Sequence, residues 1–374
     1  MIQPNKKLIK AYETDASQIK GIVEKVIIPE TMNELQEAVK SNQRIMIRGA
    51  GTGLAGGAVP LGDIVIDLSK FDKIENFNRI RKTVEVEAGV VLDDLNRFLE
   101  SSGLEFPVNP SSHEVCTIGG MIATNAVGSR AIKYGKTTNW LDWIDIIDSN
   151  GRIHRKLKAE ISDYSGLEGI TGIIIKAGLR LNEKIERTAS LIEKDSIYSV
   201  IEKVKELKRD SNVSMIEFYD KTASKILGLS NNYNLIVEFE SNKGDLKKED
   251  YLRILKTRDK TYPLLAKAGF SRIEDPKLFL DKIPELIIWL ENNKIPVFGH
   301  ISIGILHPCF LQSEKEKIPE MIRIVKRLGG QVSGEHGIGI LKKQFVEEAD
   351  KNILRLIKRR TNPSNKFNYG KVID

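Results

Sequence analysis

Cysteine and long apolar runs are scarce in this chain of 374 residues. The two cysteines, Cys116 and Cys309, lie far apart and form no motif, which excludes a disulfide framework and predicts a reducing compartment. No apolar run approaches the roughly 20 residues that span a bilayer, and the first residues have no apolar core typical of a signal peptide. We therefore expect a cytoplasmic protein, with peripheral association with the inner face of the membrane as a further expectation.

Neither sign of charge dominates strongly. Lysine and arginine number 58, and aspartate and glutamate 51, for a formal net charge of +7. The lysines are mixed with acidic residues along amphipathic segments such as 201–209, which is typical of solvated helix faces and not of a nucleic-acid-binding stripe. No nucleic-acid partner is expected, whereas a mildly basic surface suits an anionic membrane or an acidic redox partner.

Glycine, in contrast, is concentrated in one loop, Arg48-Gly-Ala-Gly-Thr-Gly-Leu-Ala-Gly-Gly57, which has five glycines in ten residues. Such a loop is needed where the backbone approaches a ligand closely or takes positive φ repeatedly. Its Gly51, Gly53 and Gly56 have the spacing of the dinucleotide fingerprint GxGxxG. That fingerprint binds a pyrophosphate when the loop follows a strand and opens a helix.

The sequence after this loop predicts no helix. Pro60 and Gly62 would break one in its first turns, and the next run, 64–68, is β-like. The loop therefore joins two strands, and we expect its own amides to hold a phosphate in a nest-like arrangement. A plain glycine-rich turn is the alternative.

The length predicts two domains. A domain over 1–182 reads as a mixture of helices and strands, a second over 183–346 mixes long helices with strands, and 347–374 forms a last helix and a tail returning toward the first domain. Thr31 to Glu34 form a capping box that opens a helix. The expected helices cover 31–40, 91–100 and 347–360, and the expected strands cover 44–48, 64–68, 83–88, 144–148, 170–181 and 233–240.

Two further glycine clusters follow within the first domain, at 109–130 and 166–172. The first places hydroxyl and amide side chains beside a glycine pair, and these groups hydrogen-bond phosphate and flavin edges without adding charge. Three such clusters in one domain indicate a long ligand threaded along the backbone.

Four motifs in order resemble the vanillyl-alcohol oxidase or para-cresol methylhydroxylase (PCMH) type of flavoprotein: Arg48-Gly-Ala-Gly-Thr-Gly-Leu, Thr117-Ile-Gly-Gly, Lys133-Tyr-Gly and Glu168-Gly-Ile-Thr-Gly. The resemblance covers nearly the whole chain and implies an α+β fold, in which a two-subdomain FAD-binding domain carries an α+β cap domain over the flavin. Covalently flavinylated relatives often have a histidine in the first glycine loop, which this loop lacks, so non-covalent FAD is expected. The implied cofactor-binding residues are Arg48, Gly49, Ala50, Gly51, Thr52, Gly53, Leu54, Pro110, Ser111, Thr117, Gly119, Gly120, Ala123, Thr124, Asn125, Gly128, Tyr134, Gly135, Glu168, Gly169, Gly172, Ile173, Ile174 and Asn368.

Three of the five histidines, His300, His307 and His336, gather in two glycine-rich segments of the second domain. A spacing of seven is not that of one helix face, so strand ends or loops would have to bring His300 and His307 together. With the Glu335 carboxylate they would form an open site suited to Zn²⁺, Mn²⁺ or Fe²⁺. The alternative is that these groups only satisfy local hydrogen bonds.

These segments resemble those of the D-lactate, glycolate and D-2-hydroxyglutarate dehydrogenases. The resemblance assigns metal ligation to His300, His307 and Glu335, and the role of catalytic base to His336. It places the substrate carboxylate on Arg258, whereas Arg272 lies near a second cationic position with an offset of about one residue.

The implied reaction oxidises a small 2-hydroxy acid to the 2-oxo acid by hydride transfer to the flavin, with the metal lowering the pKa of the alcohol. The sequence has no NAD site, so the expected electron acceptor is a quinone, an electron-transfer flavoprotein or an iron–sulfur subunit, with O₂ as a further alternative. A homodimer is also expected.

The chain departs from the subgroup in one segment, where Ser302, Ile303 and Ile305 replace the usual Gly, Asp and Asn. Two polar groups become apolar, which should dry and reshape the pocket. Either the substrate is more apolar or the site has degenerated. Two rival functions therefore stay open: an FAD-binding subunit of a glycolate oxidase-like complex without turnover of its own, and a metal-free sugar or lactone oxidase.

Overall fold

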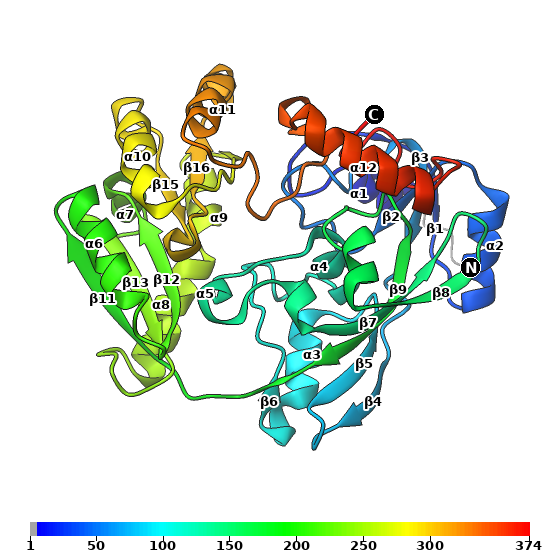
Figure 1. Cartoon of the computed structure of the whole chain (residues 1–374), viewed down its shortest axis with the longest axis horizontal. Helices are drawn as coiled ribbons and strands as arrows, with labels where there is room; N and C mark the ends of the chain where they lie inside the picture. The colour runs from blue at the N-terminus through cyan, green and yellow to red at the C-terminus, as the bar shows by residue number, and fades with distance from the viewer. Residues whose placement is uncertain (1–5) are drawn as a thin grey trace. The chain divides into compact units, whose positions relative to one another are not determined.

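Two compact units make up the chain in a computed structural model that describes residues 6–374 (Figure 1). Unit 1 comprises the described residues up to Ala126 together with Lys136–Lys184 and His336–Asp374. Unit 2 comprises Val127–Gly135 and Ile185–Glu335. Compared with the domain ends expected at residues 182 and 346, residues 127–135 join the second unit and residues 336–346 join the first.

A three-stranded parallel sheet in the order β1-β3-β2 forms one part of unit 1. Its strands are β1 (Ile22–Ile27), β2 (Ile45–Arg48) and β3 (Leu61–Asp67), and the helix α2 (Met32–Ser41) packs on it through Leu35, Ala38 and Val39. The C-terminal tail continues the sheet, because Ile45 forms backbone hydrogen bonds with Lys366 and Asn368.

The expected start of α2 is confirmed. The Thr31 hydroxyl accepts a hydrogen bond from the N–H of Glu34 at 3.3 Å. The Glu34 carboxylate bonds the N–H of Glu30 at 2.9 Å, one residue earlier than a standard capping box would have it.

A five-stranded sheet in the order β4-β5-β9-β7-β8 forms the other part of unit 1. The strands are β4 (Ile74–Asn78), β5 (Thr83–Glu87), β7 (Leu141–Ile147), β8 (Ile153–Leu157) and β9 (Ile173–Arg180), all paired antiparallel. The apolar sides of α3 (Leu92–Leu99) and α4 (Ile118–Thr124) share one core with the central strands. The sequence did not predict β4 and β8, because both are edge strands with mostly polar side chains.

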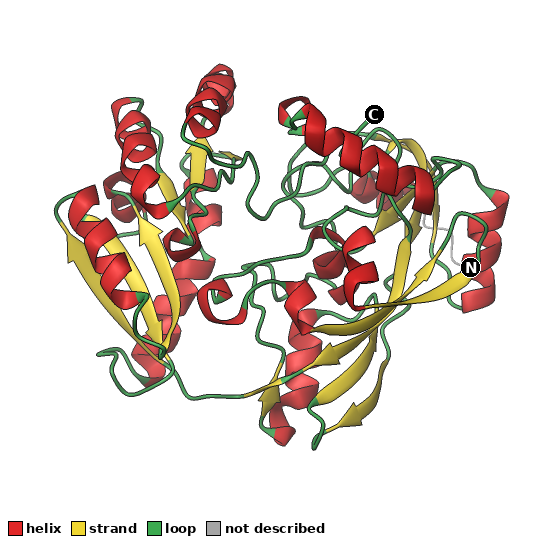
Figure 2. Ribbon diagram, viewed as in Figure 1, coloured by secondary structure: helices red, strands yellow, loops and turns green. Residues whose placement is uncertain are grey.

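Unit 2 contains a six-stranded antiparallel sheet in the order β11-β13-β12-β15-β16-β14 (Figure 2). Every residue of the central strands β12 (Val213–Tyr219) and β13 (Tyr233–Phe239) is buried. The other strands are β11 (Thr188–Lys194), β14 (Arg272–Ile273), β15 (Val297–Gly299) and β16 (His307–Phe310). The helices of this unit are α5 (Ala131–Tyr134), α6 (Ile197–Leu207), α7 (Lys221–Ile226), α8 (Lys248–Asp259), α9 (Thr261–Lys267), α10 (Ile283–Asn292) and α11 (Ile318–Arg327).

Unit 1 is completed by α1 (Lys6–Tyr12), by the short pair β6 (Leu104–Glu105) and β10 (Asn182–Glu183), and by α12 (Glu348–Thr361), which confirms the last expected helix. Within residues 6–374, no helix has both the length and the apolar character needed to cross a membrane.

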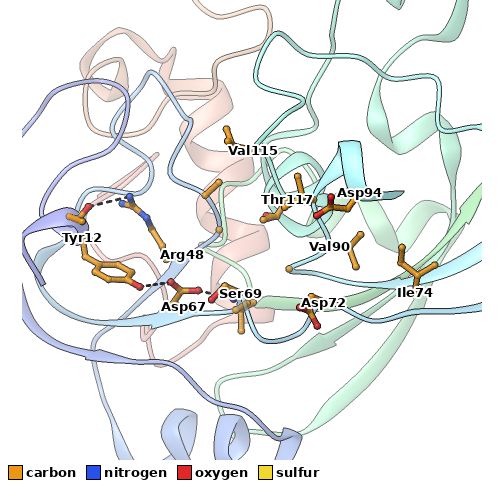
Figure 3. A pocket seen from close by; sticks show the side chains of 16 residues that line it. Tyr12, Arg48, Asp67, Ser69, Asp72, Ile74, Val90, Asp94, Val115 and Thr117 are labelled. Atoms are coloured by element: carbon orange, nitrogen blue, oxygen red, sulfur yellow. Dashed lines mark hydrogen bonds between the residues drawn. The ribbon is translucent and has the colours of Figure 1, made fainter. Parts of the chain in front are cut away.

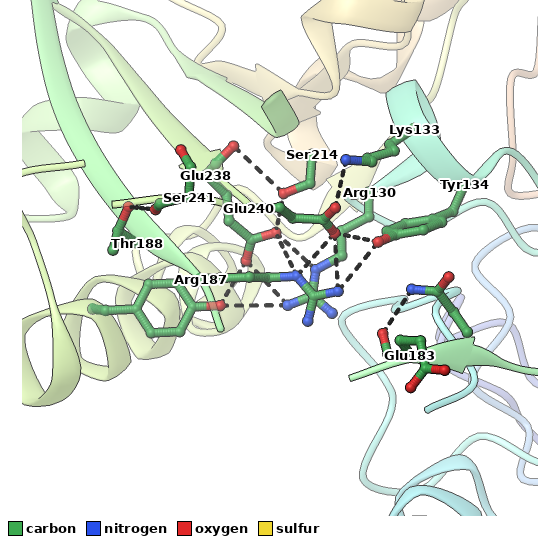
Figure 4. Close-up of polar contacts among 12 residues, drawn as sticks. Arg130, Lys133, Tyr134, Glu183, Arg187, Thr188, Ser214, Glu238, Glu240 and Ser241 are labelled. Atoms are coloured by element: carbon green, nitrogen blue, oxygen red, sulfur yellow. Dashed lines mark hydrogen bonds and ion pairs between the residues drawn. The ribbon is translucent and has the colours of Figure 1, made fainter. Parts of the chain in front are cut away.

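A buried ion-pair network holds residues 127–135 in unit 2 (Figure 4). Arg130 binds both carboxylate oxygens of Glu238, at 2.8 and 3.0 Å. Arg187 lies 3.1 Å from Glu240, which also pairs with Lys133 and accepts a hydrogen bond from the Tyr134 hydroxyl. Burial opposes ionisation of Glu238, but the charges of Arg130 and Arg187 prevail and lower its pKa to about 2.

We predict that Arg130→Ala destabilises the protein by about 3–5 kcal/mol, because it leaves the buried Glu238 carboxylate without its bidentate partner. Arg155→Ala is the matched control: it removes a bidentate pair with Asp145 at 2.8 and 2.9 Å whose arginine is half exposed, and should cost less than about 1 kcal/mol. Urea denaturation at neutral pH measures both changes.

The difference in the free energy of unfolding between the wild type and Arg130→Ala should shrink as the pH falls toward 2. A carboxyl group with a lowered pKa stabilises the fold above its ordinary pKa, and that contribution disappears on protonation. Equal costs for the two variants at neutral pH would contradict the assignment of Arg130 as the main anchor of this segment.

Candidate functional site

The first glycine loop joins β2 to β3 without a helix, as expected. Its first residues, Arg48, Gly49 and Ala50, line a cavity of about 500 Å³ in unit 1 together with residues from the segments 11–12, 67–74, 89–94 and 115–117 (Figure 3). Gly51 and Gly56 have φ of 71° and 80°, which only glycine adopts readily. At Gly53, an added Cβ would meet no atom within 4 Å, so this part of the loop faces open space.

The start of α4 lies directly beside the glycine loop. The Thr117 hydroxyl accepts a hydrogen bond from the N–H of Gly120 at 3.2 Å, and a Cβ at Gly49 would come within 2.7 Å of that hydroxyl. Glycine at 49 is therefore required by close packing. The second glycine cluster meets the first here, so the loop amides expected to hold a phosphate lie beside the first turn of this helix.

Arg48 fixes the position of the glycine loop through its guanidinium group. Its guanidinium donates to the backbone carbonyls of Thr14 at 2.8 Å and Ala58 at 3.1 Å, so the side chain ties the start of the loop to its end and to the segment after α1, and Arg48 also lines the cavity. Tyr12 donates to Asp67 at 2.6 Å at the same end of the cavity. Burial and the Asp67 carboxylate raise the pKa of Tyr12, so its hydroxyl stays protonated.

Several cavity-lining residues were missed by sequence reasoning. Most of them lie at the end of β3, between β3 and β4, or after β5, and the one sequence signal was Gly89, two residues after the end of β5. A Cβ at Gly89 would collide with the backbone of Leu68 and Phe71, so the two strand ends pack without space for a side chain. The missed residues are Ala11, Tyr12, Asp67, Leu68, Ser69, Asp72, Ile74, Gly89, Val90, Val91, Asp94 and Val115.

The second and third glycine clusters are joined by backbone hydrogen bonds. The N–H of Gly166 donates to Ile122 at 3.2 Å and that of Glu168 to Ala123 at 2.8 Å. The Glu168 carboxylate in turn accepts the N–H groups of Ile338 at 2.6 Å and Gly339 at 3.0 Å. Burial raises the pKa of Glu168 despite these two bonds.

Asn368 completes this arrangement. Its amide oxygen accepts the N–H of Ile47 at 3.1 Å, and its amide nitrogen donates to the Glu168 carbonyl. All the expected cofactor-binding residues belong to unit 1, with the exception of Gly128, Tyr134 and Gly135, which belong to unit 2. The polar atoms of Glu168 and Asn368 are thus used to fix the backbone around the glycine loops.

A second site lies in unit 2, where the β15–β16 hairpin brings His300 and His307 together. His300 follows β15, His307 begins β16, and Phe298 pairs with His307 across the hairpin. The two imidazole rings lie 5.4 Å apart, centroid to centroid, at an angle of 89°. The tight connection needs Gly304, whose φ is 80° and whose Cβ would collide with the Leu278 carbonyl.

Glu335 joins the two histidines from the loop after α11. Its carboxylate lies 3.1 Å from His307 Nε2 and 3.5 Å from His300 Nε2, and one donor atom from each of the three residues falls within 4.8 Å of the others. Asp275 fixes this loop, since it accepts the N–H groups of Gly334 at 3.0 Å and Glu335 at 2.7 Å. Two imidazoles and one carboxylate are a donor set that suits Zn²⁺ with an open coordination position.

Glu217, in the middle of β12, was not predicted from the sequence. Its carboxylate lies 3.0 Å from His300 Nδ1 and 3.8 Å from the Nε of Arg258. Burial opposes the charged form of His300, but Glu217 and Glu335 outweigh it and raise the pKa of that imidazole to about 10. A single carboxylate in an otherwise apolar strand was the available signal.

The two expected substrate cations have different surroundings. Arg258 lies in the last turn of α8, is buried, and pairs with Asp259 at 2.8 Å as well as with Glu217. Arg272, in β14, pairs with Glu274 at 2.5 Å. Arg258 is thus the cation that the structure links to the histidine cluster through Glu217.

Ser302, Ile303 and Ile305, which replace the usual Gly, Asp and Asn, lie in the connection between β15 and β16. Ser302 and Ile305 are buried, and a Cβ at Gly334 would come within 2.6 Å of Ile305. Ile305 therefore packs an apolar side chain directly beside the loop that carries Glu335. His336, the next residue, is the first of the C-terminal segment of unit 1 and is partly buried.

Two protein families match parts of this chain. Residues 23–156 match the FAD binding domain family, and residues 279–372 match the C-terminal domain of FAD linked oxidases. A D-lactate dehydrogenase of Archaeoglobus fulgidus is 30% identical, with 93% of this chain and 91% of the relative covered. Glycolate oxidase subunit GlcD of Bacillus subtilis is 27% identical, with 96% and 91% covered.

A D-2-hydroxyglutarate dehydrogenase of Xanthomonas citri is 33% identical over 42% of this chain, a stretch that spans only 36% of that relative. The solved structure of an alkyldihydroxyacetonephosphate synthase has the same fold, with a TM-score of 0.68 and 15% identity over 98% of this chain and 82% of the synthase. The fold and the family matches are those of a flavin-dependent oxidoreductase. This chain belongs to the FAD-linked oxidases with a PCMH-type FAD-binding domain, and the expected α+β fold, FAD cofactor and enzyme class are confirmed.

We predict that Gly53→Ala weakens FAD binding by about tenfold or more, because a methyl group there would occupy space that the pyrophosphate needs. The position is open and its φ is not positive, so the stability of the flavin-free protein should change by no more than about 1 kcal/mol. Fluorescence titration with FAD and thermal unfolding of the flavin-free protein measure the two effects. Wild-type affinity would show that the flavin does not approach the loop at Gly53.

We also predict that His300→Ala and His307→Ala lose bound divalent metal. Each variant removes one of the three donors, and His154→Ala, which alters an exposed histidine paired with Asp148, should keep the wild-type metal content. Elemental analysis of the purified proteins provides the measurement. Unchanged metal in the first two variants would remove these histidines from the ligand set.

Proposed function

We propose that the protein is an FAD-dependent dehydrogenase of a D-2-hydroxy acid, of the D-lactate, glycolate or D-2-hydroxyglutarate type, which it oxidises to the 2-oxo acid. The observation that carries this proposal is the convergence of His300, His307 and Glu335, with buried Arg258 linked to them through Glu217. The names of the D-lactate and D-2-hydroxyglutarate dehydrogenases among its relatives support the same substrate class.

Each side chain has a distinct role in this reaction. Arg258 binds the substrate carboxylate, since a buried guanidinium forms strong bidentate bonds with carboxylates. His300, His307 and Glu335 hold the metal, with zinc preferred over manganese or iron for this donor set. His336, the next residue after Glu335, takes the proton of the substrate hydroxyl as the general base. Arg272 is a secondary candidate for orienting the substrate.

Two bound groups supply the remaining chemistry. His300, His307 and Glu335 would hold a divalent metal that would lower the pKa of the substrate alcohol, and the glycine loops would hold FAD, without a covalent link, as the acceptor of the hydride. The residues of this chain orient the substrate, exclude water and move one proton to His336.

The replacement of polar groups by Ile303 and Ile305 favours a substrate with a short or apolar side chain. An additional carboxylate on the substrate would have to be desolvated beside these isoleucines without compensation. D-lactate should therefore be a better substrate than D-2-hydroxyglutarate.

Reoxidation of the flavin requires a partner. We propose a quinone, an electron-transfer flavoprotein or an iron–sulfur subunit as the electron acceptor, with peripheral association with the inner face of the membrane and a homodimeric state as further parts of this proposal. Because Ile303 and Ile305 replace polar groups, a second candidate function is an FAD-binding subunit without turnover of its own.

Anaerobic titration of the holoenzyme tests the dehydrogenase. D-lactate, glycolate and D-2-hydroxyglutarate are added separately while the visible absorbance band of the flavin is followed. We expect D-lactate to bleach the flavin fastest, and His336→Gln to slow the bleaching by about 10²–10⁴-fold with FAD still bound.

Three results would count against the proposal. If none of the acids bleaches the flavin after Zn²⁺ or Mn²⁺ is added, although dithionite does, the non-catalytic subunit is favoured. If His336→Gln reduces at the wild-type rate, the base is another group. If bleaching is undiminished in His300→Ala, the metal has no part in the reaction.

A further inference from the structure

Glu217 is a fully buried carboxylate in the middle of a strand whose other residues are all buried as well. Placing an ionised carboxylate in such a position costs free energy unless charged or hydrogen-bonding partners compensate for it. Its partners are His300, whose Nδ1 lies 3.0 Å away, and Arg258, whose Nε lies 3.8 Å away. Both contacts are made by the same oxygen, Oε2.

The contact with Glu217 decides which nitrogen of His300 faces the cluster. Because Nδ1 points to Glu217, Nε2 points to Glu335, at 3.5 Å. An imidazole that donates Nδ1–H to a carboxylate would give up its Nε2 proton to an incoming metal and bind that metal through the Nε2 lone pair. The ring is thus held in the orientation and tautomer that a metal ligand needs.

The charge balance around the cluster gives an independent argument. The guanidinium of Arg258 lies within 4 Å of the carboxylates of Glu217 and Asp259. A third carboxylate, that of Glu335, is linked to Glu217 through His300, which contacts both. When both histidines are deprotonated, as metal ligation requires, these three carboxylates and one guanidinium carry two net negative charges. A divalent cation would neutralise this excess, whereas replacing Glu217 by a neutral residue would remove half of it.

We propose that Glu217 is a positioning residue that fixes His300 for metal ligation and at the same time ties it to Arg258, so that the metal ligand and the substrate-binding cation share one anchor. This inference rests on the proposed function, since it assumes that His300 is a metal ligand and that Arg258 binds the substrate. Carboxylates behind metal-bound histidines typically change metal affinity by 10–100-fold.

The test compares Glu217→Gln with a matched control, Asp220→Asn. Both changes replace a buried carboxylate by its amide, and Asp220 lies just after the end of β12. Asp220 instead caps α7, accepting the N–H of Ala223 at 2.7 Å, a role that asparagine fills equally well. The holoprotein is stripped of metal, and Zn²⁺ alone is titrated against a chromogenic chelator.

We expect Glu217→Gln to bind Zn²⁺ about 10–100-fold more weakly than the wild type, and Asp220→Asn to bind it within about threefold of the wild type. The flavin spectrum and the unfolding temperature report whether each variant is folded. Wild-type zinc affinity in Glu217→Gln would overturn the proposal. Equal losses in both variants would also overturn it, because they would report only the loss of buried charge.

A second measurement needs no variant of Glu217 and decides the question if that variant does not fold. In the zinc-loaded wild type, nitrogen-15 NMR of the histidine rings, with His300 assigned by its absence in His300→Ala, should show the proton on Nδ1 and the metal on Nε2. The opposite tautomer would overturn the proposal. A wild type that binds no zinc would overturn the metal part of the proposed function as well, whereas normal zinc binding with an unaffected Glu217→Gln would overturn the positioning role alone.

Discussion

Two buried carboxylates accept backbone N–H groups on either side of His336, and the geometry of the segment that carries Glu335 and His336 depends on them. Asp275 binds the N–H groups of Gly334 and Glu335, and Glu168 binds those of Ile338 and Gly339. Charge-assisted bonds of this kind are stronger than ordinary backbone hydrogen bonds. A segment without regular secondary structure is therefore held within each unit by an acid of that unit, and Glu335 and His336 occupy the short interval between the anchors.

Both units place carboxylates in their interior. Glu168, Glu217, Glu238 and Asp275 are all buried, and each is compensated by backbone N–H groups, a histidine or an arginine. Such groups contribute little net stability compared with apolar residues of the same size. Their value lies in specificity, since a misplaced strand or loop would leave an uncompensated charge in the interior.

Residue type and spacing were sufficient to predict much of the fold and of the site. Pro60 and Gly62 correctly ruled out a helix after the glycine loop, because backbone chemistry alone decides that point. His300 and His307 were expected to meet through strand ends or loops in their glycine-rich segments, and the β15–β16 hairpin provides that meeting. Glu217 could not be assigned, because a lone carboxylate in an apolar strand reveals that a partner exists but not which one, and strand order supplies that answer. The polar edge strands β4 and β8 were missed for a related reason: their pairing is set by neighbouring strands and not by their own apolar pattern.

The pairing of the C-terminal tail with β2 has a further consequence for the order of folding during synthesis. Ile45 forms hydrogen bonds with Lys366 and Asn368, which lie over 300 residues later in the chain. Unit 1 cannot be completed until almost the whole protein has left the ribosome, whereas all of unit 2 is available once Glu335 has emerged. The unit that carries the histidine cluster can therefore finish folding first, and the unit that binds the flavin closes last around its own C-terminus.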